Sequence, residues 1–170
     1  MSDVRFMDTP AGRIALRAEQ PGDEAFLFAL FRSHALPELA QMPVDQATRE
    51  ALTRMQFDSQ TRTYRANFPN AAFDILELDG APIGRLLVDD GGNEGCVVDF
   101  ALLPERQGGG LGTAVMRKVV ERFALMGRAV RCKVLTHNAA SMRMCAKAGF
   151  ISIAEIPPFL QLEWRPARIV

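Results

Sequence analysis

The residues with the clearest chemical potential are four glycines within a five-residue stretch: Gly108, Gly109, Gly110 and Gly112. A β-type apolar run over residues 97–103 precedes them, and an apolar pattern of helical spacing follows from Leu111 to Phe123. The expected order is therefore strand, glycine loop, helix. Glycines leave backbone N–H groups uncovered, and the N-terminus of a helix favours anions. We therefore expect this loop to hold a phosphate-bearing ligand.

Three phosphate-binding motifs compete for these glycines. A P-loop requires a lysine after its last glycine, whereas Thr113 follows Gly112. A dinucleotide fingerprint requires a third glycine where Thr113 stands, and it belongs on the first strand of a βαβ unit. The third motif, Gln/Arg-x-x-Gly-x-Gly/Ala, is matched by Gln107, Gly110 and Gly112. The spacing favours the third motif.

Length and composition limit the classes of function. The chain has 170 residues, and we expect residues 1–170 to form a single domain. Lysine plus arginine number 20 and aspartate plus glutamate number 20, so the formal net charge is zero. A general nucleic-acid binder needs a basic face, and we therefore expect no nucleic-acid partner.

The cysteines and the apolar runs indicate the cellular setting. Cys96, Cys132 and Cys145 are odd in number and form no C-x-x-C motif, so we expect neither a disulfide framework nor a metal site. The longest apolar run, residues 25–31, is far shorter than a membrane span. The first residues lack the apolar region of a signal peptide. We predict a cytoplasmic protein with no membrane partner.

The hydrophobic pattern predicts the elements that position the glycine loop. Strands are expected at residues 13–17, 73–78, 82–88, 96–103, 129–135, 150–156 and 159–164. Helices are expected at residues 21–31, 45–64, 111–123 and 138–147. Asp79-Gly80 between two apolar runs predicts a hairpin. The order β-α-α-β-β-β-α-β-α-β-β predicts an α/β (α+β) fold with a mixed sheet of about seven strands and helices on both faces.

Two segments resemble motifs of the GCN5-related N-acetyltransferase (GNAT) superfamily. Residues 102–114, Leu-Leu-Pro-Glu-Arg-Gln-Gly-Gly-Gly-Leu-Gly-Thr-Ala, look like its acyl-CoA motif. Residues 138–150 resemble its second motif, Asn-x-x-Ala-x-x-Leu-Tyr-x-Lys-x-Gly-Phe. The order of elements matches over nearly the whole chain. The resemblance implies an acyl-CoA-dependent N-acyltransferase that uses acetyl-CoA as co-substrate and no metal.

The resemblance also implies how the co-substrate is bound. The CoA pyrophosphate is expected at the backbone N–H groups of the loop that begins at Gln107: Gly108, Gly109, Gly110, Leu111, Gly112 and Thr113. Ala101 and Leu102, on a splayed strand, are expected to bind the pantetheine arm through their backbone, with Asn138 on the other side. The loop from Ser33 to Pro43 and the helix after it are expected to shape the acceptor site.

In this family an amine attacks the thioester directly, so two protons must be moved. An amine with a pKa of ~10.4 is reactive in roughly 1 of 2,500 molecules at pH 7, a handicap of about 4.6 kcal/mol, and a general base is therefore useful. Asp99, a carboxylate in an otherwise apolar strand, is the candidate base or amine contact. The alternative for Asp99 is a solvent-facing residue or a buried hydrogen-bond partner.

The departing thiolate needs a proton, which the family commonly takes from the tyrosine of the second motif. Cys145 occupies that position here. A thiol with a pKa of ~8.5 is acidic enough, but its side chain is shorter than a phenol. Cys145 is therefore the candidate acid, and the alternative is a small residue that packs beside the CoA sulfur.

The expected function is transfer of an acetyl group to a primary amine of a small molecule or peptide, with a homodimer as a candidate assembly. A catalytically weak or inactive CoA-binding sensor domain is the rival, because the tyrosine is missing. A nicotinamide enzyme is the third alternative, since it would use the same glycines.

Overall fold

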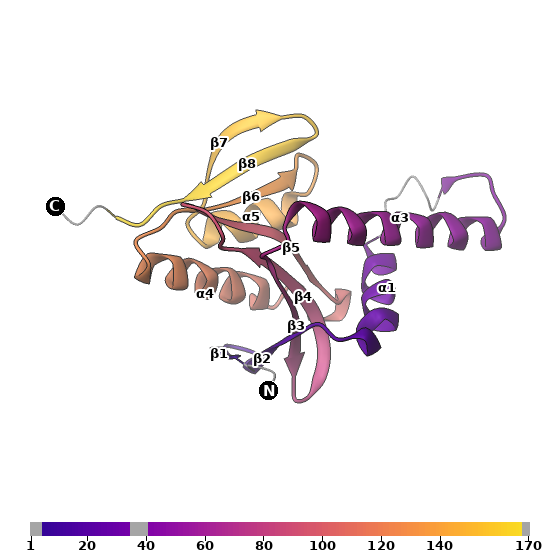
Figure 1. Ribbon diagram of the computed structural model, residues 1–170, viewed down its shortest axis with the longest axis horizontal. Coiled ribbons are helices and arrows are strands. Elements are labelled where there is room, and N and C mark those ends of the chain that lie inside the picture. The colour runs from indigo at the N-terminus through magenta and orange to yellow at the C-terminus, as the bar shows by residue number, and fades with distance from the viewer. Residues whose placement is uncertain (1–4, 35–40, 168–170) are drawn as a thin grey trace. The chain divides into compact units, whose positions relative to one another are not determined.

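The computed structural model describes residues 5–34 and 41–167 of the chain. They divide into two compact units (Figure 1): a sheet unit, Met1–Ala18 with Asn70–Val170, and a helical unit, Glu19–Pro69. Each unit is described by itself below. The expectation of one domain over residues 1–170 stays a prediction.

The sheet unit contains one eight-stranded sheet with the order β1-β2-β3-β4-β5-β6-β8-β7. Its strands are β1 Arg5–Thr9, β2 Gly12–Ala18, β3 Ala72–Leu78, β4 Ala81–Asp89, β5 Gly95–Leu102, β6 Val130–Leu135, β7 Ile151–Ile156 and β8 Phe159–Trp164. Every neighbouring pair is antiparallel except β5 and β6. A parallel pair requires a crossover, and helix α4, Leu111–Leu125, supplies it. The mixed α/β fold is confirmed.

The sheet has one strand more than the seven expected. The additional strand, β1, pairs with β2 at the edge of the sheet. None of its side chains is fully buried, and Phe6 is 57% exposed. An edge strand that buries so little needs no alternation of apolar and polar residues, so the hydrophobic pattern did not reveal it.

The hairpin between β3 and β4 has the turn that its sequence predicts. Asp79 and Gly80 have φ angles of 53° and 77°. Positive φ at both central residues is the mark of a primed two-residue turn, whose twist matches that of the strands. The hairpin places β4 beside β5, the strand that leads to the glycine loop.

Helix α4 supplies one face of the core of the sheet unit. Its apolar stripe is buried: Leu111, Val115, Met116, Val119, Val120 and Phe123. Helix α5, Ala139–Lys147, packs beside it. The Arg117 guanidinium of α4 donates to the Lys147 carbonyl at the end of α5, at 3.1 Å from Nη2. That bond satisfies a carbonyl that the helix itself leaves without a donor.

The described part of the helical unit includes a 3₁₀ turn, Pro21–Asp23, and the helices α1, Glu24–Ser33, and α3, Gln46–Asn67 (Figure 1). The Phe57 ring of α3 lies 5.5 Å from the Phe28 ring and 5.6 Å from the Phe31 ring of α1, between centroids. Asp45 caps α3 by accepting from the Thr48 N–H at 2.7 Å. Most of the predicted loop between Ser33 and Pro43, residues 35–40, lies outside the described residues.

Gly95, the first residue of β5, allows the close approach of α4 to the sheet. A Cβ atom there would lie 2.1 Å from the ring of Phe123, which is fully buried. We expect Gly95→Ala to lower the free energy of unfolding by about 1–3 kcal/mol, because the ring has no space to retreat into. Urea unfolding measures the difference. The control is Gly92→Ala, whose Cβ would come no closer than 3.7 Å to any neighbour; equal stability of the two variants would contradict the packing argument.

Candidate functional site

The glycine loop lies between the end of β5 and the start of α4. A short 3₁₀ turn, Pro104–Arg106, follows β5, and α4 begins at Leu111. Gly110 is the N-cap residue of α4, with φ at 81°, in the left-handed region. Glycine is achiral and adopts this conformation freely, whereas an L-amino acid pays roughly 1–2 kcal/mol there. The sequence therefore needs glycine at this position to turn the chain into the helix.

The loop presents uncovered backbone donors at the helix N-terminus. Across the described residues, no acceptor bonds to the N–H groups from Gly108 through Thr113, and the first bond of the helix runs from Ala114 N–H to Gly110 O at 3.0 Å. No side chain caps α4. A Cβ at Gly108, Gly109 or Gly110 would have no neighbour within 4 Å. An anion can therefore approach the donors without steric hindrance.

Next to this loop, β5 parts from β6. The two strands pair over only three positions: Gly95 with Val130, Cys96 with Arg131, and Val97 with Cys132. Beyond them, β5 continues to Leu102 and β6 continues to Leu135 beside β8. Among the described residues, no strand pairs with this edge of β5 from residue 98 to residue 102. The splayed strand that the resemblance implies corresponds to β5, and the gap lies between β5 and β6 beyond Val97.

The direction of the backbone along β5 can be read from two contacts with β4. The Leu103 N–H, just past the strand, donates to Ile83 O at 2.9 Å. The Ala101 carbonyl oxygen lies against Gly84, 2.4 Å from where a Cβ would stand. Residues 101 and 103 therefore turn their backbone groups toward β4.

Because these groups alternate in direction along a strand, Phe100 and Leu102 turn theirs toward the gap. The Leu102 carbonyl accepts a bond there from Gln107 Nε2 at 2.9 Å, which ties the loop to the strand end. Two residues were expected to bind the pantetheine arm through their backbone. The backbone groups of Leu102 face the gap, whereas those of Ala101 face β4. Phe100 was not predicted. The period of two along the strand would have paired it with Leu102, but only once the register with β4 is known.

Asp99 lies on the sheet face opposite α4. The side chains of Phe100 and Leu102 adjoin Gly112 of α4, and Asp99 therefore points the other way. Arg85 of β4, which is 7% exposed, donates to Asp99 Oδ2 from Nε at 2.8 Å and also from Nη2. The carboxylate of Asp99 is thus half of an ion pair between neighbouring strands.

Cys145 is buried within the core of the sheet unit. It is 1% exposed, and its Sγ lies 3.9 Å from Sγ of Cys132, which is 5% exposed on β6. The hydrogen bond to Cys145 and burial both raise the pKa of Cys132. Met144, the preceding residue, is the one that lies against Gly112. The thiol of Cys145 thus lies within the core, next to a second buried thiol.

Asn138 begins α5 as its N-cap, and its Oδ1 accepts from the Ser141 N–H at 3.0 Å. This confirms the predicted cap. The exposed side-chain amide NH₂ of Asn138 makes no hydrogen bond to the residues that the structure describes.

The described residues contain neither a metal-ligating cluster nor a helix suited to a membrane. No group of three or more His, Cys, Asp or Glu residues is arranged to hold a metal ion among residues 5–34 and 41–167. In the same ranges, no helix combines the length and the apolarity that crossing a membrane requires.

Solved structures of similar fold come from several organisms. One is the PaiA N-acetyltransferase from Thermoplasma acidophilum in complex with coenzyme A, with a TM-score of 0.67 and 15% identity, covering 89% of this chain and 98% of that one. Another is RimJ from Mycobacterium smegmatis in complex with CoA-disulfide, with a TM-score of 0.64, 18% identity and coverage of 95% and 86%. A third is YncA from Salmonella typhimurium with its cofactor acetyl-CoA, with a TM-score of 0.56, 17% identity and coverage of 89% and 93%.

A comparison with curated proteins gave no match. The family model of the Acetyltransferase (GNAT) family matches residues 36–150. This range is more than half of the chain and includes the glycine loop, α4 and α5. The chain therefore belongs to the GNAT family of acetyltransferases.

Proposed function

We propose that the protein transfers an acetyl group from acetyl-CoA to a primary amine of a small molecule or peptide. One observation carries the proposal: a row of uncovered N–H groups at the start of α4 adjoins the unpaired edge of β5. The first feature suits a pyrophosphate and the second suits an extended arm that contains amides. A pyrophosphate and an extended arm with amides are both parts of one ligand, coenzyme A.

The loop residues fit the diphosphate end of that ligand. The N–H groups from Gly108 through Thr113 would hold its pyrophosphate, helped by the positive end of the helix dipole. The pantetheine arm would lie in the gap and pair with the backbone of Phe100 and Leu102, as an added strand pairs with a sheet edge. The amide of Asn138 would contact the arm from α5. Bound acetyl-CoA supplies an acetyl group activated as a thioester.

The proton steps are assigned from the burial of Cys145 and the ion pair of Asp99. The Cys145 thiol is 1% exposed, so we infer that it packs the core and that water protonates the departing thiolate. A thiolate whose acid has a pKa of ~8.5 takes a proton from water readily at neutral pH. Asp99 is bound by Arg85, and we infer that it joins β4 to β5 and does not remove the proton of the amine.

The burial of Cys145 also favours a second candidate function, a CoA-binding domain with little or no catalysis. Without an enzymic acid the transfer rate falls by a factor of typically ~10²–10⁴. The cytoplasmic location, the homodimer and the absence of a nucleic-acid partner stay predictions.

The first experiment measures CoA thiol released from acetyl-CoA in the presence of a panel of primary amines. We expect amine-dependent release, with the acetylated amine identified by mass spectrometry. Reactions without amine, and with the matching alcohols, control for hydrolysis. Binding of CoA without turnover of any amine would support the sensor domain instead.

A second prediction concerns the phosphate cradle. Gly109→Asp adds a negative charge in open space next to the loop donors, and we expect the dissociation constant of CoA to rise by about tenfold or more. Calorimetric titration measures it, and a melting temperature close to the parent's shows that the fold is intact. Gly109→Ala, which adds only a methyl group, should bind CoA like the parent. Unchanged affinity of Gly109→Asp would place the phosphates elsewhere.

A third prediction separates packing from catalysis at Cys145. Cys145→Tyr should lower the free energy of unfolding by about 1–3 kcal/mol or more, because the site is full, and it should not raise the rate of transfer. Cys145→Ala should keep the parent's rate, and Cys132→Ala is the matched removal of a thiol. A rate loss of ~10² in Cys145→Ala alone, with its fold intact, would make Cys145 the acid after all.

A further inference from the structure

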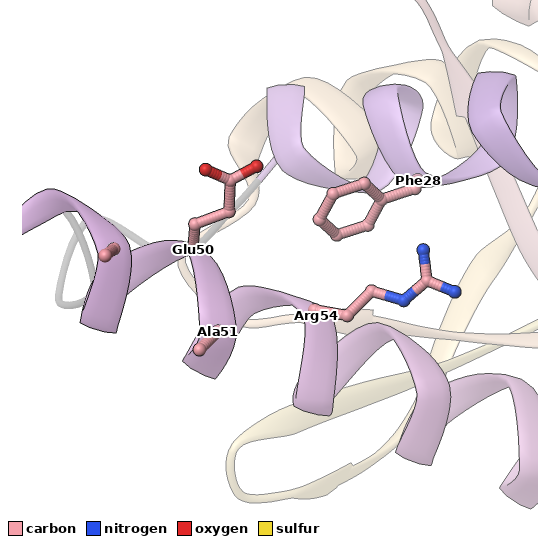
Figure 2. Close-up of a pocket in the computed structure, with 5 residues that line it drawn as sticks. Phe28, Glu50, Ala51 and Arg54 are labelled. Atoms are coloured by element: carbon pink, nitrogen blue, oxygen red, sulfur yellow. The ribbon is translucent and has the colours of Figure 1, made fainter.

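Reactive side chains outside the candidate site meet on the surface and in the core. On the surface of the helical unit, Figure 2 shows Glu50 and Arg54 of α3 near Phe28 of α1. Arg54 is bonded there to Glu24 and Asp58, and Glu50 is exposed to solvent. In the core of the sheet unit, two thiols instead face each other away from solvent. The thiols have a reaction open to them, because each can bond covalently to the other.

The thiol pair joins a helix to the sheet. Cys132 lies on the buried face of β6 with Val130 and Val134, and Cys145 is the residue that α5 buries. Both cysteines are free, and their Sγ atoms lie 3.9 Å apart although the residues are 13 positions apart in the sequence. A covalent bond between them would therefore fix α5 on β6.

The two sulfurs are close to bonding distance. A disulfide bond holds its sulfurs about 2.0 Å apart, so those of Cys132 and Cys145 need to approach by about 1.9 Å. Rotation of each side chain about its Cα–Cβ bond supplies part of this shift. Helix α5 has nine residues and buries only Cys145 among them, so a small movement of the helix supplies the remainder.

The pair also lies where the pairing of two strands ends. Cys132 is the last residue of β6 that pairs with β5, opposite Val97. Beyond it, no described strand lies between β5 and β6. Local opening at such a point costs less free energy than global unfolding, and it admits a molecule as small as hydrogen peroxide.

We propose that Cys132 and Cys145 form a redox-active dithiol, which hydrogen peroxide oxidises to an intramolecular disulfide and which a dithiol reductant restores. The inference does not depend on acetyl transfer, and its test needs no CoA. The loop that the disulfide closes contains the whole connection between β6 and α5. Oxidation would therefore hold together two elements that flank the candidate site.

The reaction takes place in two steps. The Cys145 thiolate attacks one oxygen of the peroxide and becomes a sulfenic acid, while the O–O bond breaks and the departing hydroxide is protonated to water. The Cys132 sulfur then attacks Sγ of Cys145, the S–S bond forms, and the hydroxyl leaves as a second water. Two hydrogens and two electrons pass from the thiols to the peroxide. The hydrogen bond from Cys132 lowers the pKa of Cys145, which favours Cys145 as the thiolate.

The first test identifies the bond by mass spectrometry. The full chain is treated with hydrogen peroxide, its remaining thiols are blocked in denaturant, and it is digested with trypsin, which separates Cys132 in peptide 132–133, Cys145 in peptide 144–147 and Cys96 in peptide 86–106. We expect peptides 132–133 and 144–147 to be joined, and a dithiol reductant added before blocking should separate them. Peptide 86–106 should carry the blocking group.

An internal gauge makes a negative result decisive. Met55 is exposed, so its conversion to the sulfoxide shows that the peroxide dose was sufficient. If Met55 is oxidised while Cys132 and Cys145 are both blocked as free thiols, the proposal is wrong. A disulfide that involves Cys96 or a second chain in place of this pair would also overturn it.

The second test measures the Tm of each protein before and after peroxide treatment. Closing the loop should raise the Tm of the parent by roughly 5 °C or more. Cys96→Ala should keep this rise, whereas Cys132→Ala and Cys145→Ala should lose it. Each variant is compared with its own reduced form, so the effect of the substitution on stability cancels. A rise that persists in Cys132→Ala would refute the assignment of the pair.

Discussion

The parting of β5 from β6 is the constraint on which the candidate site depends. Here the pairing stops after three positions, although β5 runs on to Leu102 and β6 to Leu135. The helix that makes the crossover starts from the far end of β5, so its uncovered N–H groups and the unpaired strand edge adjoin one another. The loop, the gap and the start of α4 thus lie together at the end of β5 that does not pair with β6.

The elements around this gap could be predicted because each has a local cause. Asp79-Gly80 makes a primed turn wherever two apolar runs flank it, and Asn138 caps a helix through its own side chain. The helix after the glycines follows from a stripe of apolar residues that must be buried. Short-range chemistry of this kind is visible in a single sequence. Strand β1 is the exception, because it is held by pairing with β2 and hardly by burial of its own side chains.

The contacts and orientations of individual residues could not be predicted, because they depend on segments that are distant in the sequence. Asp99 stands alone in its strand, and only the register of β4 reveals that Arg85 lies beside it. Cys145 stands where the family motif has tyrosine, and only the packing of α5 on β6 reveals that the thiol meets Cys132. The backbone directions of Ala101 and Leu102 likewise depend on contacts with β4. Motifs identify the positions of such residues, and tertiary contacts decide what they can do.

The brief pairing of β5 with β6 has a consequence for cooperativity. Strands β1–β5 form one half of the sheet, and β6, β8 and β7 form the other, joined in the sheet by those three positions. A ligand whose amides bond to the backbone of Phe100 and Leu102 would act as a further stretch of strand and extend the junction between β5 and β6. Its binding would then raise the free energy needed to separate the two halves of the sheet, and this gain would grow with the logarithm of the ligand concentration. On this view the co-substrate is also a structural member of the sheet.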